Sequence, residues 1–285
     1  LSFAQFFLIR VIRLSMVEFT KKYKIGSRRF GLINWVGAWT LYKKEVLRFL
    51  IVWIQTIFSP LISSLLFLLV LSLAIGADRG DILGVPFITF LAPGLISMQV
   101  IQQSFSHSSS SFMIGKIQGN ILDLLYAPLS AAEVTVSISL AAVTRSVMIA
   151  AVSIIVFKLI IKIEITNYLL LVIFTLLSSF ILGNIGIIAG LWAEKFDHMA
   201  TVTNFVIVPL SFLSGTFYSI DRLPEFLQIV SKANPFFYMI DGFRYSFIGQ
   251  ADGSITVGLV YLTILSVVSW FITYLLYKNG YKIKS

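Results

Sequence analysis

Residues 234–249, NPFFYMIDGFRYSFIG, are almost as apolar as a membrane span, yet they open with Asn-Pro and contain two charged side chains. Asn234 suits a helix N-cap and Pro235 suits the first helical turn. A helix of about 15 residues reaches only about 22 Å, against roughly 30 Å of hydrocarbon in a bilayer. The segment is too apolar for a free loop and too short to cross, so we expect a re-entrant helix.

The rest of the sequence predicts an all-α integral membrane protein. Hydrophobic residues make up 58% of the chain and charged residues 12%, with a mean hydropathy of +0.92. Soluble domains contain roughly 45–50% apolar residues. Because a spanning helix needs about 20 apolar residues, the sequence predicts six transmembrane helices, at about residues 49–76, 84–107, 133–157, 166–193, 200–220 and 254–277.

Positive charge flanks both ends of this apolar region. The net charge is +9; ten of the 22 Lys and Arg residues precede the first predicted span, and Lys278, Lys282 and Lys284 follow the last. Cytoplasmic segments carry such an excess. We therefore expect both termini in the cytoplasm, a basic cytoplasmic segment at residues 1–33, and contact with membrane lipids rather than nucleic acid. The absence of cysteine excludes disulfides and thiolate metal sites.

An amphipathic helix is predicted just before the first span. One stripe at helical spacing contains Trp35, Trp39, Tyr42, Val46 and Phe49. Lys44 and Arg48 fall on the opposite face. A helix of this kind lies in the membrane interface, so we expect it to form an elbow into the bilayer. A longer first span is the alternative, but it would carry residues 43–45 into lipid.

The loop at residues 107–133 contains a second short amphipathic helix. Its pattern is carried by Gly119, Ile121, Leu124, Leu125 and Pro128, with the proline ending the helix. Such a helix either packs on its own bundle or presents itself to a cytoplasmic partner. Both interpretations fit the spacing.

Two short helices are expected between the fifth and sixth spans, at residues 223–231 and 235–250. In the second, Asp241 and Arg244 are three residues apart and can pair on one face. The aromatic residues are predicted to sit at the external interface; they are Phe236, Phe237, Tyr238, Phe243 and Tyr245. The hairpin would act as a gate or as a structural plug.

Arg145 is the one charged residue deep in a predicted span. A central arginine costs about 2.5–3.5 kcal/mol on insertion scales, so we expect it to bond to helix carbonyls or to the amides of Asn184 or Asn204. Contact with an anionic part of a substrate, or with another subunit, is the alternative. Gly186 and Gly190 form a small-xxx-small step that favours close helix packing.

The sequence contains little that could support catalysis. No Gly-x-x-x-x-Gly-Lys-Ser/Thr loop is present, and neither a nucleophile with its base nor a set of metal ligands is evident. We therefore expect no catalytic, cofactor-binding or metal-binding residues in this chain. An ion-coupled secondary carrier is an alternative, weakened because no carboxylate lies inside a span. A membrane scaffold without transport is another.

Three stretches together resemble one family. They are FLAPGLISM at residues 90–98, GKIQGNILDLLYAPLS at 115–130, and the long stretch at 209–249 that ends in the opening segment. This combination is similar to the permease subunits of ABC-2 type ABC transporters, in particular bacterial half-transporters with a separate ATPase. The resemblance covers residues 34–285.

The resemblance implies a six-helix protomer that dimerises, most simply as a homodimer, around a transport path in the bacterial inner membrane. Two copies of an ABC ATP-binding subunit would bind ATP and Mg and drive export. Residues 115–130 match the coupling-helix region, and the segment after the fifth span matches the external re-entrant helices. The implied substrates are amphiphiles, glycans, lipid-linked molecules or drugs.

Overall fold

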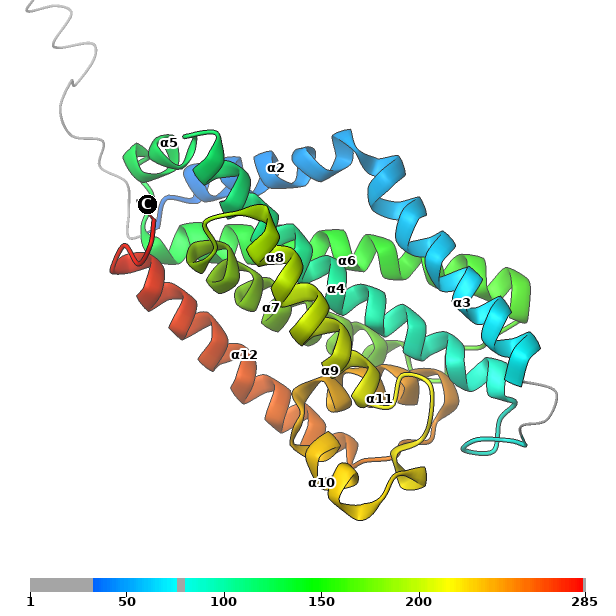
Figure 1. Ribbon diagram of the computed structural model, residues 1–285. Helices are drawn as coiled ribbons and strands as arrows, with labels where there is room; N and C mark the ends of the chain where they lie inside the picture. Colours follow the sequence, from blue (N-terminus) through cyan, green and yellow to red (C-terminus); the bar gives the residue numbers. More distant parts are fainter. Residues whose placement is uncertain (1–32, 76–79, 284–285) are drawn as a thin grey trace, which may run out of the picture. The chain divides into compact units, whose positions relative to one another are not determined.

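The computed structural model of the chain describes residues 33–75 and 80–283 (Figure 1). Contacts divide the chain into two units, residues 1–35 and 36–285, and nearly all of the architecture below belongs to the second. The described residues are mostly helical and contain no strand, which confirms the predicted all-α class. Apart from its last residue, the predicted basic segment 1–33 lies outside the described residues.

The helices follow one another with short connections. The α-helices are α2 (Trp35–Ile51), α3 (Ser59–Ile75), α4 (Phe87–Ile117), α5 (Ile121–Tyr126), α6 (Ala131–Ile161), α7 (Tyr168–Trp192), α8 (Phe196–Val202), α9 (Val208–Leu213), α10 (Glu225–Ala233), α11 (Pro235–Ile248) and α12 (Ile255–Lys278). Two π-helical turns, η1 (Ile54–Phe58) and η2 (Thr203–Ile207), precede α3 and α9, and a 3₁₀ turn, η3 (Ile220–Arg222), precedes α10.

Five helical segments among the described residues are long and apolar enough to cross a membrane. They are Ile54–Ala74, Ala131–Ile161, Tyr168–Trp192, Phe196–Leu213 and Ile255–Lys278. The chain is therefore a multi-pass membrane protein. The remaining predicted span corresponds to α4, which is not among the five; it contacts α3, α6, α7 and α11, so protein rather than lipid surrounds most of it. A sixth span stays a prediction.

Side-chain caps explain where several helices begin. Ser130 and Glu133 form a reciprocal capping box at the start of α6, with hydrogen bonds of 3.3 and 2.7 Å. Asn167 caps α7, and Ser254 caps α12. Each side chain satisfies a backbone N–H that the first helical turn leaves without a partner. Local sequence thus sets the starts of three long helices.

Glycines bring α4 and α7 into close contact. A Cβ atom at Gly186 would lie 2.6 Å from the carbonyl oxygen of Phe105, and one at Gly190 would lie 2.9 Å from the Cβ of Phe112. Only a residue without a side chain fits such an approach. The predicted packing role of these two glycines is confirmed.

Two π-turns lie in spans of which only a small part is buried. Pro60 follows η1 and Pro209 follows η2, both inside the next helical turn. A proline has no N–H to donate and its ring crowds the carbonyl four residues earlier. Widening the preceding turn relieves this crowding, and π-turns occur often at functional sites.

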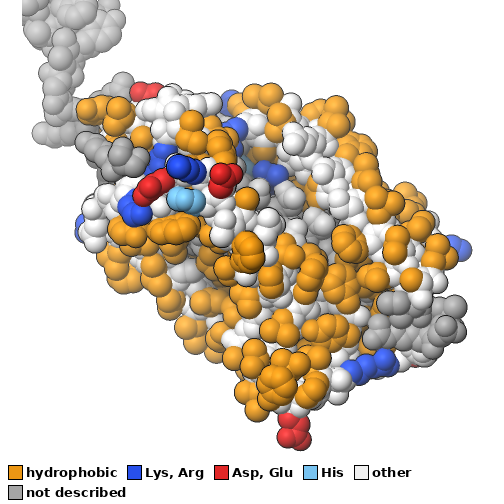
Figure 2. Space-filling model, viewed as in Figure 1, with side chains coloured by type: hydrophobic (Ala, Val, Ile, Leu, Met, Phe, Trp, Pro, Cys, Tyr) orange, Lys and Arg blue, Asp and Glu red, His pale blue; other side chains and the backbone are white. Residues whose placement is uncertain are grey.

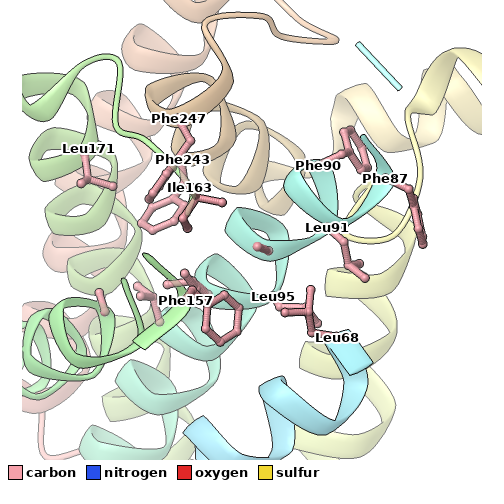
Figure 3. Packing of buried hydrophobic residues seen from close by; sticks show 14 of the residues in the cluster. Leu68, Phe87, Phe90, Leu91, Leu95, Phe157, Ile163, Leu171, Phe243 and Phe247 are labelled. Atoms are coloured by element: carbon pink, nitrogen blue, oxygen red, sulfur yellow. The ribbon is translucent and has the colours of Figure 1, made fainter. Parts of the chain in front are cut away.

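An apolar core joins α11 to the long helices (Figure 3). Phe243 and Phe247 of α11 lie in one cluster with Phe157 of α6 and with Phe90 and Leu95 of α4. Ten of the 14 residues of α11 are buried. The opening segment is therefore held inside the bundle rather than on its surface.

Polar and apolar side chains separate along the surface. Figure 2 shows hydrophobic side chains over most of the visible face, with a group of charged side chains and a histidine at the end where Figure 1 places α5. A hydrophobic band with charge at its limit is the surface expected of a protein in a bilayer.

Candidate functional site

The turn into α11 is fixed by Asn234. Its side-chain oxygen accepts a hydrogen bond from the N–H of Phe236 at 3.1 Å, which confirms the predicted cap. Its amide nitrogen donates to Ser214 Oγ at 2.7 Å and to the carbonyl of Leu210 at 3.1 Å. The residue Pro235 occupies the first turn of the helix. Asn234 therefore ties the α10–α11 hairpin to the end of α9.

Arg244 is buried and locks α11 to the chain that follows α9. Its guanidinium donates to the carbonyl oxygens of Gly215 at 2.6 Å and Thr216 at 3.2 Å. Its Cζ lies 3.8 Å from the ring centroid of Phe90, within the range of a cation–π contact. Gly94 leaves the space for this arrangement, because a Cβ there would lie 2.6 Å from the carbonyl oxygen of Thr216.

Asp241 binds a different part of the chain. Its two carboxylate oxygens accept hydrogen bonds from the backbone N–H groups of Asp252 and Gly253, at 3.0 and 2.9 Å. Among the described residues, the ion pairs within 4 Å do not include Asp241 with Arg244. The predicted pairing of these two side chains is wrong, because each bonds to backbone groups of a separate connection; the Nε of Arg244 is left buried without a hydrogen-bond partner.

Asp252 is a linking residue that the sequence did not reveal. Its carboxylate accepts a hydrogen bond from Ser219 Oγ at 2.6 Å and from the N–H of Ile220 at 3.2 Å. Asp241 and Asp252 together join α11, the segment leading into α12, and η3. Asp252 lies in a polar QADG stretch that resembles an ordinary loop, so only its spatial neighbours identify it.

The aromatic residues of α11 divide into two groups. Phe236, Phe237 and Phe243 are at most 3% exposed, so the prediction that they sit at the external interface is wrong; they form core contacts instead. Tyr238 and Tyr245 are half-buried. The ring of Tyr238 packs edge-on against Tyr261 of α12, with 5.3 Å between centroids.

Arg145 bonds to a residue that the sequence analysis did not consider. Its guanidinium donates to Gln103 Oε1 on α4. Asn184 instead accepts from Ser139 Oγ at 3.0 Å and donates to the carbonyl of Phe180, and Asn204 is exposed. The predicted bonds from Arg145 to these two asparagines are therefore wrong: one amide is already satisfied and the other faces outward.

The helix α2 is attached to the bundle through polar contacts. Trp35 and Trp39 are exposed and Tyr42 donates to or accepts from Thr144 Oγ1 of α6 at 2.8 Å. Arg48 was predicted on the solvent face, but its guanidinium donates to the carbonyl of His107 on α4 at 3.0 Å. The buried face of α2 includes Glu45, which explains the turn of Arg48 toward the bundle.

The short helix α5 is present where the loop pattern predicted it, with Ile121 facing the bundle. Leu124 is half-buried against the same core cluster, whereas Leu125 points outward. Gly119 adopts φ +75° before the helix, a conformation that favours glycine, and Pro128 is exposed after it. Leu122 and Tyr126 are exposed too, at 43% and 85%, and the sequence analysis overlooked them.

A small cavity lies behind α5. It measures about 40 Å³ and is lined by residues of α2, α4, α5 and α6, including Glu45, Ser111, Gly115, Ile121 and Leu124. Native cores have few voids larger than a water molecule. Side chains therefore do not fill the space on the inner side of α5 completely.

Charged contacts join three segments near α5. Lys116 donates to the carbonyls of Leu191 and Ala193 at the end of α7. Lys282, after α12, lies 3.1 Å from Glu194. The hydrogen bond and the charge of Lys282 hold the pKa of Glu194 below its ordinary value. These contacts connect the end of α4 with the segments after α7 and α12.

Comparison with known proteins gives the family. Residues 37–248 match the model of the ABC-2 type transporter. The chain belongs to this family. Both its α5 loop and its α10–α11 hairpin lie within the matched region.

The chain is also similar to individual proteins, and the similarity covers nearly the full length of each of them. The chain is 31% identical over 253 residues to the inner membrane transport permease YadH of Escherichia coli K12, covering 89% of this chain and 99% of YadH. It is 23% identical over 246 residues to nodulation protein J of Rhizobium leguminosarum bv. viciae, covering 85% and 93%. The similarity thus extends over almost the whole of both relatives.

Proposed function

We propose that this chain is the permease subunit of an ATP-driven exporter in a bacterial inner membrane. The observation that carries the proposal is the family match over residues 37–248, together with 31% identity to YadH, whose name is that of an inner membrane transport permease. The described residues supply a multi-helix membrane body rather than a catalytic cleft. Transport of an amphiphile, a glycan, a lipid-linked molecule or a drug fits such a body.

A separate ATP-binding subunit would supply the energy. The sequence has no phosphate-binding loop of its own, so ATP and Mg would be bound by two copies of this partner. The exposed apolar side chains of α5 give the partner a surface to dock on. The cavity behind α5 leaves room for that helix to shift when the partner closes on ATP.

A second copy of the chain would complete the transport path. In the most apolar 18-residue windows of Ile54–Ala74, Phe196–Leu213 and Ile255–Lys278, 22%, 17% and 22% of the residues are buried, against 61% in Tyr168–Trp192. The first two of these spans include the π-turns. We propose a homodimer in which they face the path or the partner protomer, with α4 as a sixth span and both termini in the cytoplasm.

The α10–α11 hairpin would close the external end of the path. Its two hydrogen-bonded anchors, Arg244 and Asp241, hold separate connections, so movement of the hairpin would be passed to both α9 and α12. Tyr238, packed on Tyr261, is the residue whose surroundings would change most. The interfacial position of α2 would keep the cytoplasmic end aligned with the bilayer surface.

The test is ATPase coupling in the complex with the co-purified ATP-binding subunit. Replacing the outward residues Leu125 and Tyr126 together by Asp should abolish the stimulation of ATP hydrolysis by the permease, because two charges would oppose an apolar contact. Asp123→Asn, on the same exposed helix, is the matched control and should couple normally. If the double variant assembles the complex and couples normally, α5 is not the docking site of the ATP-binding subunit.

Co-purification separates the two other classes of function. Gentle extraction should bring down an ATP-binding cassette protein in stoichiometric amount. A chain that moves solute in vesicles without such a protein would be an ion-coupled carrier, and one that moves none would be a scaffold.

A further inference from the structure

A polar cluster joins α2, α4 and α6 within the apolar part of the bundle. Arg145 lies near the middle of α6 and Gln103 near the middle of α4, and the guanidinium of Arg145 donates to the amide oxygen of Gln103. The Nε of Arg145 is buried without a hydrogen-bond partner. None of the ion pairs among the described residues includes Arg145.

The carboxylate of Glu45, which lies in this cluster, already accepts hydrogen bonds from other side chains. Glu45 is 4% exposed; its Oε2 accepts from Arg48 Nε at 3.0 Å and from Ser111 Oγ at 2.8 Å. Arg48 and Arg145 bond to adjacent turns of α4, at the carbonyl of His107 and the side-chain amide of Gln103. Arg48 therefore occupies this carboxylate, and the ion pairs among the described residues leave Arg145 without a counter-ion.

A buried histidine without hydrogen-bond partners lies beside this cluster. His107 is fully buried, and neither ring nitrogen has a hydrogen-bond partner; its Nε2 lies 3.8 Å from Glu45 Oε2, too far for a hydrogen bond. Buried polar groups without partners are rare in folded proteins. The cluster thus contains buried nitrogen atoms without hydrogen-bond partners and one arginine, Arg145, without an ion-pair partner among the described residues.

We propose that Arg145, together with Arg48 and Gln103, binds the anionic headgroup, phosphate or carboxylate, of an amphiphile that enters from the membrane. This deepens the proposed transport function and rests on it for the claim that the amphiphile is cargo. A guanidinium presents a planar fork of donors that matches either headgroup. Arg145 is partly exposed, so a headgroup can reach it.

The apolar part of the ligand has a place beside the cluster. On α6, Leu140 and Val147 are 45% and 38% exposed, one turn to either side of Thr144, which precedes Arg145. On α2, Ile51 is 81% exposed, one turn beyond Arg48. Exposed apolar side chains beside a partly exposed guanidinium suit a lipid-like molecule and disfavour a free polar anion.

The experiment measures binding of dodecyl phosphate to the nucleotide-free complex in phosphatidylcholine nanodiscs. Wild type should bind it saturably. Arg145→Gln should bind about 10- to 100-fold more weakly, the value of a charge-assisted hydrogen bond. Gln103→Glu should lose binding as well while melting at a higher temperature, because it supplies the missing counter-ion. Arg222→Gln, at an exposed external site, should bind as wild type does.

Other ligands distinguish the sources of the headgroup. Phosphatidylglycerol in the nanodisc should compete with dodecyl phosphate, whereas inorganic phosphate alone and dodecyl maltoside should not bind. Unchanged affinity in both Arg145→Gln and Gln103→Glu would overturn the proposal, and so would equal binding of inorganic phosphate. Because no nucleotide is present, binding can fail while ATPase coupling persists, or persist while coupling fails.

Discussion

Replacing Arg244 by Met retains most of the side-chain length and removes the guanidinium that holds α11 in place. The wild-type group makes two hydrogen bonds, at 2.6 and 3.2 Å, and one contact with Phe90. Hydrogen bonds from a charged donor contribute about 1.5–3 kcal/mol each, and a desolvated cation–π contact adds about 2 kcal/mol. The cost of burying the charge, several kcal/mol, offsets part of this.

The net destabilisation expected for Arg244→Met is about 2–4 kcal/mol, since the variant also leaves two carbonyl groups without their donor. That corresponds to a melting temperature lower by roughly 5–15 °C. Thermal unfolding in detergent, followed by tryptophan fluorescence and by size-exclusion after heating, measures it. Arg222→Met, the same exchange at an exposed position, is the control and should melt with the wild type.

Two outcomes would refute this reasoning. Arg244→Met melting with the wild type would mean that desolvation cancels the contacts completely. Arg244→Lys matching the wild type would mean that charge alone, rather than the two-carbonyl geometry, holds the hairpin. We expect the melting temperature of Arg244→Lys to lie between those of the wild type and Arg244→Met.

Two further predictions concern other parts of the chain. Gly242→Ala should destabilise the fold by about 1–3 kcal/mol through overpacking, because its Cβ would lie 2.1 Å from the ring of Phe174; normal thermal unfolding of this variant would contradict the packing described. Lys282→Ala should raise the pKa of Glu194 toward its ordinary value, since it removes the hydrogen bond and charge that lower it, so this carboxylate should protonate at higher pH in a carboxyl titration than in the wild type; an unmoved titration would contradict the pairing.

The sequence predicted the all-α class, the positions of most spans and the start of α11, because these depend on local properties. Hydrophobic runs locate spans, and side chains such as Asn234 cap helices within three residues of themselves. The starts observed for α6, α7 and α11 follow from the same kind of local hydrogen bond. The helix α4 is less apolar than a lipid-facing span because its neighbours are protein.

Side-chain partners were not predictable in the same way. Asp241 and Arg244 have the spacing of a helical pair, yet both bind backbone groups far along the chain, at residues 252–253 and 215–216. Arg145 bonds to a glutamine 42 positions away. A one-dimensional pattern gives the face of a helix on which a residue lies, whereas the partner depends on which helix packs there.

The π-turns η1 and η2 also change which side chains of their spans lie on one face. A π-turn holds one residue more than an α-turn, and one residue of an α-helix corresponds to a rotation of about 100°. The stripe of side chains beyond each π-turn is therefore offset from the stripe before it. A single straight helix would show one continuous face to one neighbour. In the span Phe196–Leu213, where η2 lies between α8 and α9, two differently oriented faces follow one above the other and can contact different neighbours at two depths of the bilayer, whereas η1 lies at the start of the span Ile54–Ala74.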